Sequence, residues 1–198
     1  KLTIFRRLLC CGMACCALAL AGCDTVFDVH PYDVHIRGEK GINAKNIALI
    51  ENATLDKDTI RLAFISDSHK YYNGLQDIIK DINRRDTIDF VVHCGDITDC
   101  GSTREYEWAR DNIARLNKPY VVLLGNHDCL GTGNEVYERM FGDPDFSFIA
   151  GRVKFVCLNT NAIEYDYSRP VPNFDFMEQE MTSRADEFSR TVMCKIGR

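Results

Sequence analysis

The apolar stretch YVVLLG, residues 120–125, stops on Asn126, His127 and Asp128, so that residues 123–128 read LLGNHD. A run of consecutive apolar residues predicts a strand that is buried on both faces. Glycine and asparagine also suit a simple turn, because both tolerate positive φ. A turn is therefore a sufficient explanation for this hexapeptide alone, and the rest of the chain decides whether its polar side chains have a chemical role.

Two earlier apolar runs end in the same way. RLAFIS, residues 61–66, leads into DSH, and IDFVVHC, residues 88–94, leads into GDITD. Asp67 and Asp96 are 29 positions apart, and Asp96 and Asn126 are 30 apart, which is about one strand–helix–strand unit. We therefore expect the three polar clusters at the carboxyl ends of neighbouring parallel strands, where open α/β sheets bind ligands.

The segments between these strands have the periodicity of helices. Two helices are predicted from apolar residues spaced three or four positions apart, which are Leu75, Ile78, Ile79 and Ile82 in the first and Tyr106, Ala109, Ile113 and Leu116 in the second. Ser102 and Glu105 fit a capping box at the start of the second helix. Strands that alternate with helices at this spacing predict an α/β domain with right-handed crossovers.

Other elements are expected on either side of this core. They are a strand at NIALIE (46–51), a short helix near 134–141, a hairpin of FSFIA and RVKFVCL with Gly151 in its turn, a helix over 174–189 and a strand at TVMC (191–194).

The beginning of the chain differs from the rest. Three basic residues precede an apolar run over residues 8–22, which is too short to span a bilayer comfortably and is typical of an export signal. The stretch LAGC at 20–23 resembles the lipobox of bacterial lipoproteins. That resemblance implies that residues 1–22 are removed and that Cys23 is acylated. Residues 23–45 would then form a lipidated tether to a domain over 46–198, on the periplasmic side of a bacterial envelope membrane or at the cell surface.

Charge and cysteine content narrow the possible functions. Without residues 1–22 the chain has 21 basic and 29 acidic residues, a formal charge of −8, which argues against binding to nucleic acid. Five cysteines follow Cys23, and none of them form a CxxC pair. The sequence therefore predicts neither a zinc finger nor a disulfide framework.

The polar clusters have the chemistry of a metal site. Carboxylates and imidazoles that converge on one point remain unpaired unless a cation neutralises them. Asp67, His69, Asp96 and Asn126 form a mixed nitrogen and oxygen donor set that suits Zn, Mn or Fe. The two carboxylate oxygens of Asp96 could bridge two ions roughly 3.5–4 Å apart, and such a pair activates water for attack at phosphorus.

In this order and spacing, the motifs DxH, GDxxD and GNHD resemble those of the calcineurin-like metallophosphoesterase superfamily, over roughly residues 60–195. The resemblance implies an α/β/β/α sandwich, two divalent metal ions and a phosphate monoester or diester as substrate. It also implies a role for each site residue. Asp67 and His69 would bind one ion, Asp96 would bridge, Asn126 would bind the second, and His127, oriented by Asp99, would donate a proton to the leaving oxygen or stabilise the charged phosphoryl group.

The sequence departs from the family pattern in two places. The family has further histidine ligands in later motifs, whereas no histidine follows His127, so we expect a domain that is incomplete on its C-terminal side. Cys100 stands where the family's protein phosphatases have arginine, which disfavours a phosphoprotein substrate. The alternative is a catalytically silent, truncated or degenerate relative that acts as a membrane-anchored binding protein. A nucleotide-binding domain fits less well, because no glycine-rich loop follows the first strand.

Overall fold

The structure, a computed structural model, describes residues 30, 32–164, 170–182 and 189–195. The chain divides into two compact units, residues 1–33 and 34–198. In the first unit the main-chain N–H of Asp33 donates to the carbonyl oxygen of His30 at 2.9 Å. The predicted signal, residues 1–22, and the predicted acylation site Cys23 lie outside the described residues. Among the helices that the structure describes, none has the length and apolar character needed to cross a bilayer.

The second unit contains a parallel sheet built from the predicted strands. Within the described residues its strands are β1 (Leu62–Ile65), β2 (Phe90–His93) and β3 (Tyr120–Val122), in the order β1-β2-β3. Helix α3 (Tyr72–Asn83) joins β1 to β2, and α4 (Thr103–Ile113) joins β2 to β3. The register pairs Ile65 with His93, and His93 with Val122, so the three strands end at the same level. The alternation predicted from the sequence is confirmed.

A second sheet contains the predicted hairpin. Strand β4 (Phe146–Ala150) pairs antiparallel with β5 (Val153–Asn159), and β6 (Ser189–Lys195) pairs parallel with β5. Helix α5 (Gly133–Met140) precedes this sheet, and α6 (Phe174–Thr182) lies between β5 and β6 in the chain. Short 3-10 helices cover His127–Cys129 and Ala162–Glu164. Helix α6 covers the first part of the helix predicted over 174–189, residues 183–188 lie outside the described part of the chain, and Ser189 already belongs to β6.

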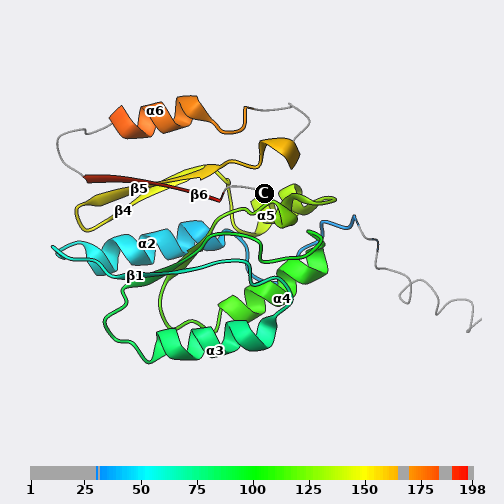
Figure 1. The fold of residues 1–198 in the computed structure, drawn as a ribbon, viewed down its shortest axis with the longest axis horizontal. Helices are drawn as coiled ribbons and strands as arrows, with labels where there is room; N and C mark the ends of the chain where they lie inside the picture. Colours follow the sequence, from blue (N-terminus) through cyan, green and yellow to red (C-terminus); the bar gives the residue numbers. More distant parts are fainter. Residues whose placement is uncertain (1–29, 31, 165–169, 183–188, 196–198) are drawn as a thin grey trace, which may run out of the picture. The chain divides into compact units, whose positions relative to one another are not determined.

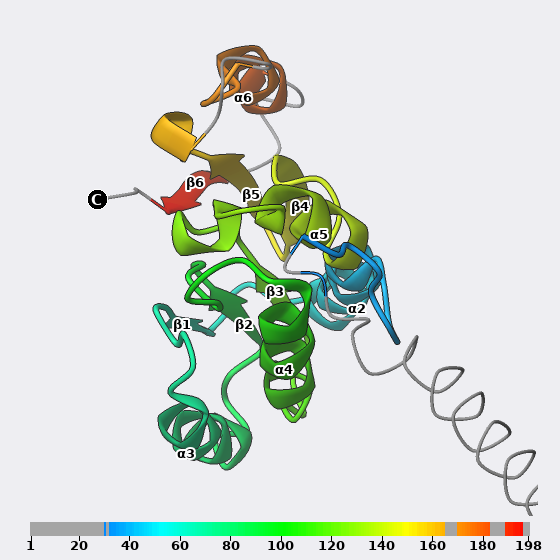
Figure 2. The same ribbon diagram turned by 90° about the vertical axis from the view of Figure 1, so that its right-hand side faces the viewer.

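The second unit is a layered sandwich of helices and sheets. Aromatic and aliphatic side chains of the two sheets pack face to face, namely Phe90, Val92, Val121 and Leu123 against Phe148, Ala150, Phe155 and Cys157. A second cluster joins the opposite face of the first sheet to α3 and α4 through residues such as Leu75, Val91 and Tyr106. Figures 1 and 2 show α6 on the outer side of the second sheet, where Lys154 Nζ lies 2.7 Å from Glu180 Oε2. The predicted α/β/β/α arrangement is confirmed.

Local signals for the two crossover helices agree with the structure. Ser102 caps α4, its side chain accepts from the main-chain N–H of Glu105, and the Glu105 carboxylate accepts from Ser102 in return. Leu75, Ile79 and Ile82 are buried along α3, whereas Ile78 is 48% exposed. Ile78 is therefore the one residue of the predicted apolar face of α3 that the core does not cover.

The prediction of a strand at residues 46–51 is wrong, because these residues belong to helix α2 (Ile42–Thr54). Ile42, Asn46, Ile50 and Thr54 are buried at a four-residue spacing, which fits one face of a helix. The predicted tether over 23–45 is also too long. Ile36 is only 4% exposed and belongs to the core, so packed structure begins well before residue 46.

Helix α2 lies beside β3 and binds its outer edge through asparagine side chains. Asn43 Oδ1 accepts from the main-chain N–H of Val122 at 2.9 Å, and Asn43 Nδ2 donates to the Val122 carbonyl oxygen at 2.9 Å. Asn46 Oδ1 accepts from the main-chain N–H of Tyr120 at 3.0 Å. Two amide side chains thereby satisfy backbone groups that a neighbouring strand would otherwise pair, which explains why a helix can occupy this edge.

Replacing Asn43 with alanine should lower the free energy of unfolding by about 2 kcal/mol, because the buried N–H of Val122 loses its acceptor. The Tyr137 hydroxyl donates to the Val122 carbonyl oxygen at 2.6 Å and would keep that group paired. Urea denaturation measures the change. Asn52→Ala, at an exposed position of the same helix, is the control and should alter stability by less than about 0.5 kcal/mol. Equal losses from the two variants would contradict this account of the β3 edge.

Candidate metal centre

The loops that follow β1, β2 and β3 are tied to one another by hydrogen bonds. The main-chain N–H of Asp67 donates to the carbonyl oxygen of Gly95 at 3.1 Å, and that of His69 donates to the carbonyl oxygen of Asp96 at 3.0 Å. The main-chain N–H of His127 donates to Asp96 Oδ1 at 3.1 Å. The second loop therefore holds the first through its backbone and the third through a carboxylate.

The backbone of these loops is strained. Asp67, His69 and Asp96 have φ values of 54°, 41° and 54°, and they are the non-glycine residues with positive φ in the part of the chain that the structure describes. Each such residue costs on the order of 1–3 kcal/mol, and such strain gathers at functional sites. Its restriction to three predicted site residues supports a functional role for these loops.

Glycines allow the second and third loops to approach each other closely. A Cβ atom on Gly125 would lie 2.2 Å from both the main-chain nitrogen and Oδ1 of Asp96. A Cβ atom on Gly95 would lie 2.5 Å from the main-chain nitrogen of Gly125, and Gly95 itself has a φ of 92°. Only glycine fits at these two positions, which explains the glycine before Asp96 and the glycine before Asn126.

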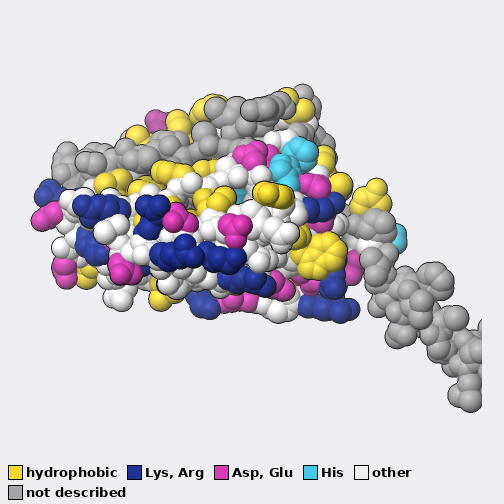
Figure 3. All heavy atoms as spheres, turned by 60° about the horizontal axis from the view of Figure 1, so that its bottom comes forward, with side chains coloured by type: hydrophobic (Ala, Val, Ile, Leu, Met, Phe, Trp, Pro, Cys, Tyr) yellow, Lys and Arg dark blue, Asp and Glu magenta, His cyan; other side chains and the backbone are white. Residues whose placement is uncertain are grey.

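Three predicted site residues converge. One possible ligand atom from each of His69, Asp96 and His127 lies within 4.8 Å of the others, and the two imidazole rings meet edge to face with centroids 4.8 Å apart. Asp96 is 3% exposed, whereas both histidines are half-buried. Figure 3 shows histidine and acidic side chains side by side at the protein surface. The centre is thus accessible from solvent on its histidine side.

The other two predicted ligands lie on the same loops, beside this cluster. Asp67 is exposed next to His69, and its Oδ2 accepts a hydrogen bond from the hydroxyl of Ser66. Asn126 is half-buried and immediately precedes the 3-10 helix that begins at His127. The structure therefore places these five predicted residues at one end of the sheet and brings three of their side chains into direct proximity.

Hydrogen bonds determine which imidazole nitrogen is available. His69 Nδ1 lies 3.0 Å from the carbonyl oxygen of Thr98 and 3.0 Å from Asp99 Oδ1, and His127 Nδ1 lies 3.0 Å from the carbonyl oxygen of Asp99. Carbonyl and carboxylate oxygens accept only, so each Nδ1 carries the hydrogen and each Nε2 is left to bind another group. Two imidazole nitrogens beside a buried carboxylate form a donor set that fits Zn, Mn or Fe.

Asp99 acts on different atoms from those expected. The prediction was that Asp99 orients His127, and the contact to His127 uses the main-chain oxygen of Asp99. The Asp99 carboxylate lies against His69 Nδ1 and, at 3.0 Å, against Lys70 Nζ. The hydrogen bond from Lys70 lowers the pKa of Asp99, so this side chain is a carboxylate at neutral pH. A side-chain substitution at Asp99 therefore acts first on His69.

Lys70 connects this carboxylate to the start of α4. Its Nζ lies 2.7 Å from Glu105 Oε1, and Glu105 Oε2 accepts from the main-chain N–H of Cys100 at 3.0 Å. Hydrogen bonds to Glu105 and Asp99 raise the pKa of Lys70. The capping-box glutamate thus also fixes the end of the second loop, so the helix start and the centre share one network.

Asp128 is a buried residue of these loops to which the motifs gave no role. It is fully buried, and its carboxylate accepts from the main-chain N–H and hydroxyl of Thr98, both at 2.9 Å, and from the N–H of Gly125 at 3.0 Å. Burial raises the pKa of Asp128 to about 6, although these hydrogen bonds act in the opposite direction. Asp128 links the second loop to the third. Its signal in the sequence is a carboxylate directly after the ligand motif and before apolar residues.

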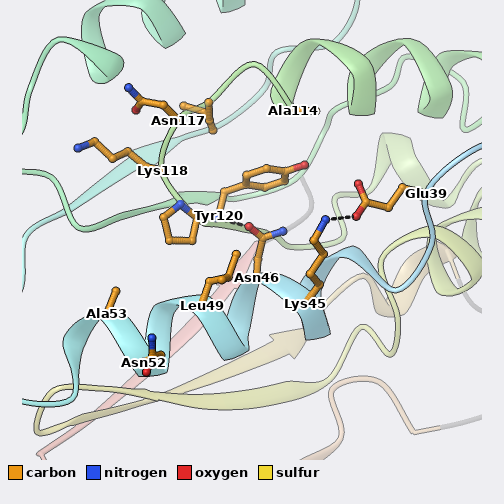
Figure 4. Close-up of a pocket in the computed structure, with 12 residues that line it drawn as sticks. Glu39, Lys45, Asn46, Leu49, Asn52, Ala53, Ala114, Asn117, Lys118 and Tyr120 are labelled. Carbon is orange, nitrogen blue, oxygen red and sulfur yellow. Dashed lines mark hydrogen bonds and ion pairs between the residues drawn. The ribbon is translucent and has the colours of Figure 1, made fainter.

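A cavity lies away from the three loops of the centre. This cavity, of about 450 Å³, is bounded by α2 and by the chain around residues 114–120 (Figure 4). Lys45 pairs with Glu39 on its wall, and burial raises the pKa of Tyr120 to about 12. Tyr120 begins β3, whereas Asn126 follows its end, so this cavity lies at the opposite end of the strand from the predicted site residues.

Comparisons with known proteins bear on this centre. A family model described as calcineurin-like phosphoesterase matches residues 60–191, more than half of the chain. The chain is 38% identical over 72 residues to glycerophosphodiester phosphodiesterase GpdQ of Enterobacter lignolyticus, a match that covers 33% of this chain and 26% of that protein. It is 42% identical over 40 residues to a probable glycerophosphodiester phosphodiesterase GpdQ of Arcobacter nitrofigilis, covering 20% of this chain and 15% of that protein.

A solved structure is also similar. Purple acid phosphatase PPD1 from seeds of yellow lupin (Lupinus luteus) superposes with a TM-score of 0.47 at 20% identity, covering 63% of this chain and 28% of that one. The present chain spans about a quarter or less of the length of the curated relatives that it matches.

Proposed function

The chain belongs to the calcineurin-like phosphoesterase family, and we propose that it is a metal-dependent hydrolase of phosphate esters that works through a two-metal site. The observation that carries the proposal is the cluster of His69, Asp96 and His127, whose ligand atoms lie within 4.8 Å of one another. Phosphate diesters are the proposed substrate class, because both curated relatives are described as glycerophosphodiester phosphodiesterases.

Four side chains would hold the metal ions. His69 Nε2 and the exposed carboxylate of Asp67 lie on the first loop and would bind one ion, and Asn126 on the third loop would bind the other. Asp96 lies between the two loops and would contact both ions. Its position supports this role, because its main-chain oxygen accepts from His69 on the first loop and its Oδ1 accepts from the main-chain N–H of His127 on the third. Bound divalent ions supply charge that polarises phosphoryl oxygens and lowers the pKa of bound water.

His127 would act on the ester itself. Its Nδ1 is held by the carbonyl oxygen of Asp99 at 3.0 Å, so its Nε2 would be left to act on a phosphoryl group bound beside Asp96. A protonated His127 can donate from Nε2 to the leaving oxygen or neutralise charge on the phosphoryl group. Because this hydrogen bond from Nδ1 fixes the ring, Nε2 would need no side-chain rotation to act in either role.

Hydrolysis of two aryl esters tests the proposal. The purified chain is stripped of metal with a chelator and then assayed with Mn²⁺ or Zn²⁺ on bis(4-nitrophenyl) phosphate and on 4-nitrophenyl phosphate. We expect hydrolysis that requires the metal and that is faster with the diester. Faster hydrolysis of the monoester would overturn the proposed substrate class, and the absence of metal-dependent hydrolysis of both esters would overturn the proposed activity.

A further inference from the structure

His93 is a buried polar residue that the proposed chemistry does not use. It is the last residue of β2, 1% exposed, and follows the fully buried Val91 and Val92. An imidazole in such surroundings loses its hydration, which is unfavourable unless a partner replaces the water. The partner that the structure gives is Ser68, whose Oγ lies 3.0 Å from His93 Nε2. The buried imidazole of His93, at the end of β2, thus contacts the loop that follows β1.

Ser68 occupies the middle of the most strained part of that loop. Its neighbours Asp67 and His69 both have positive φ, so the backbone on each side of Ser68 adopts a conformation that side-chain-bearing residues disfavour. Main-chain hydrogen bonds hold the two flanking residues to the second loop. The Ser68 side chain is turned the other way, toward the sheet, where it meets His93.

The surroundings below the loop would not fix Ser68 by packing alone. Ser68 and His93 line a cavity of about 100 Å³ together with apolar side chains that include Ile65, Leu75 and Ile78. A small hydroxyl beside such a hollow has room to rotate. The hydrogen bond to His93 therefore fixes the Ser68 side chain, and it adds to the main-chain hydrogen bonds that hold the backbone on either side of it.

We propose that His93 is a positioning residue, which clamps the strained DSH loop through Ser68 and so presents Asp67 and His69 to the metal ions. This inference rests on the proposed function for the identity of the ligands, although the clamp itself is a property of the protein without metal. His93 stabilises the geometry for metal binding and not the fold, because a leucine at the same buried position would need no hydrogen-bond partner.

If His93 acts as this clamp, replacing it with leucine should lower metal affinity without lowering the stability of the metal-free protein. His93→Leu should weaken Zn²⁺ binding by about 10-fold, the lower end of what is typical when the supporting partners of metal ligands are lost. The melting temperature of the metal-free protein should stay equal or rise. His93→Gln keeps a polar group that can reach Ser68 and should restore most of the affinity. Ser68→Ala removes the other half of the clamp without touching the core and should weaken binding to the same extent.

Two measurements separate the clamp from a general effect. Competition with a chromophoric chelator gives Zn²⁺ affinity, and NMR of the metal-free protein reports the loop through intraresidue amide–Hα NOEs, which are strongest at positive φ. Val92→Ala, on the same strand, is the control: it should lower stability and leave both readouts unchanged. If the clamp maintains the positive φ of Asp67 and His69, both residues should lose it when either half of the clamp is removed. Reduced NOEs at these two residues in His93→Leu and Ser68→Ala would therefore support the inference.

Wild-type NOEs in His93→Leu and Ser68→Ala would overturn the inference, and so would wild-type Zn²⁺ affinity in both variants. A failure of the proposed function has a different result. Wild-type protein would then bind no Zn²⁺, whereas the NOEs of the metal-free loop would still decide whether His93 holds it.

Discussion

Asp96→Asn should reduce metal-dependent turnover by more than about 100-fold, beyond the loss that is typical when a supporting partner of a metal ligand is removed. Asparagine keeps the shape of the side chain and can still accept from the main-chain N–H of His127, which Asp96 Oδ1 binds at 3.1 Å. It removes the negative charge of the residue that would contact both ions. If the wild type binds two ions per chain, as we propose, this variant should bind one or none.

The metal-free form of this variant should be as stable as the wild type or more stable. Burial raises the pKa of Asp128, and the charge of Asp96, which is itself 3% exposed, raises it further, so removal of that charge relieves a repulsion. Turnover of an aryl diester, bound metal per chain and the melting temperature of the stripped protein are the measurements. Asp99→Asn is the comparison, with an expected loss of about 10–100-fold, because the Asp99 carboxylate supports His69 at Nδ1. Similar turnover for wild type and Asp96→Asn would refute the assignment of the bridging ligand.

Gly125→Ala should have nearly as large an effect although it adds only a methyl group. The new Cβ would lie 2.2 Å from the main-chain nitrogen and from Oδ1 of Asp96, and 2.9 Å from its Cγ. These atoms cannot all move aside without shifting the carboxylate that we propose as the bridge between the ions. The backbone at Gly125 is outside the left-handed region that L side chains rarely adopt, so the steric contact alone produces the effect. We expect metal binding to be lost, together with about 1–3 kcal/mol of stability through overpacking.

A second glycine provides a matched control. A Cβ on Gly74, in α3, would lie 2.1 Å from a ring atom of Tyr71, but that side chain is 75% exposed and can turn into solvent. Gly74→Ala should therefore keep wild-type metal affinity and gain slightly in helix propensity. Titration with Zn²⁺ and thermal unfolding of both variants provide the comparison. If Gly125→Ala binds metal as tightly as Gly74→Ala does, the close approach of the second and third loops is not needed for the centre.

Local sequence was sufficient for the elements that lead to the site. The strands that end before Asp67, Asp96 and Asn126 were predicted from continuous apolar runs. β2 and β3 are buried on both faces, as such runs indicate, whereas β1 is only half-buried and its Phe64 is 57% exposed. The capping box of Ser102 and Glu105 was predicted because its two hydrogen bonds join residues three positions apart. In both cases the physical cause acts over a few residues, so the sequence contains all of it.

Helix α2 shows where local sequence was insufficient. NIALIE has apolar residues that fit a strand as well as a helix, and the choice is made by Asn43 and Asn46, whose amides bind the edge of β3. Those partners, Val122 and Tyr120, lie 79 and 74 residues away in the chain. The local sequence does not show that these amides have partners on a distant edge strand, so NIALIE taken alone was predicted as a strand.

By itself, the sequence determined which residues stand at the strand ends, and hence the family motifs and the donor chemistry of the site. Only the tertiary structure decided how those side chains are used. It turned the Asp99 carboxylate toward His69, gave His127 the main-chain oxygen of Asp99, and buried Asp128 between two loops. The reason is that spacing fixes where a side chain starts, whereas hydrogen bonds between loops some thirty residues apart fix where it points.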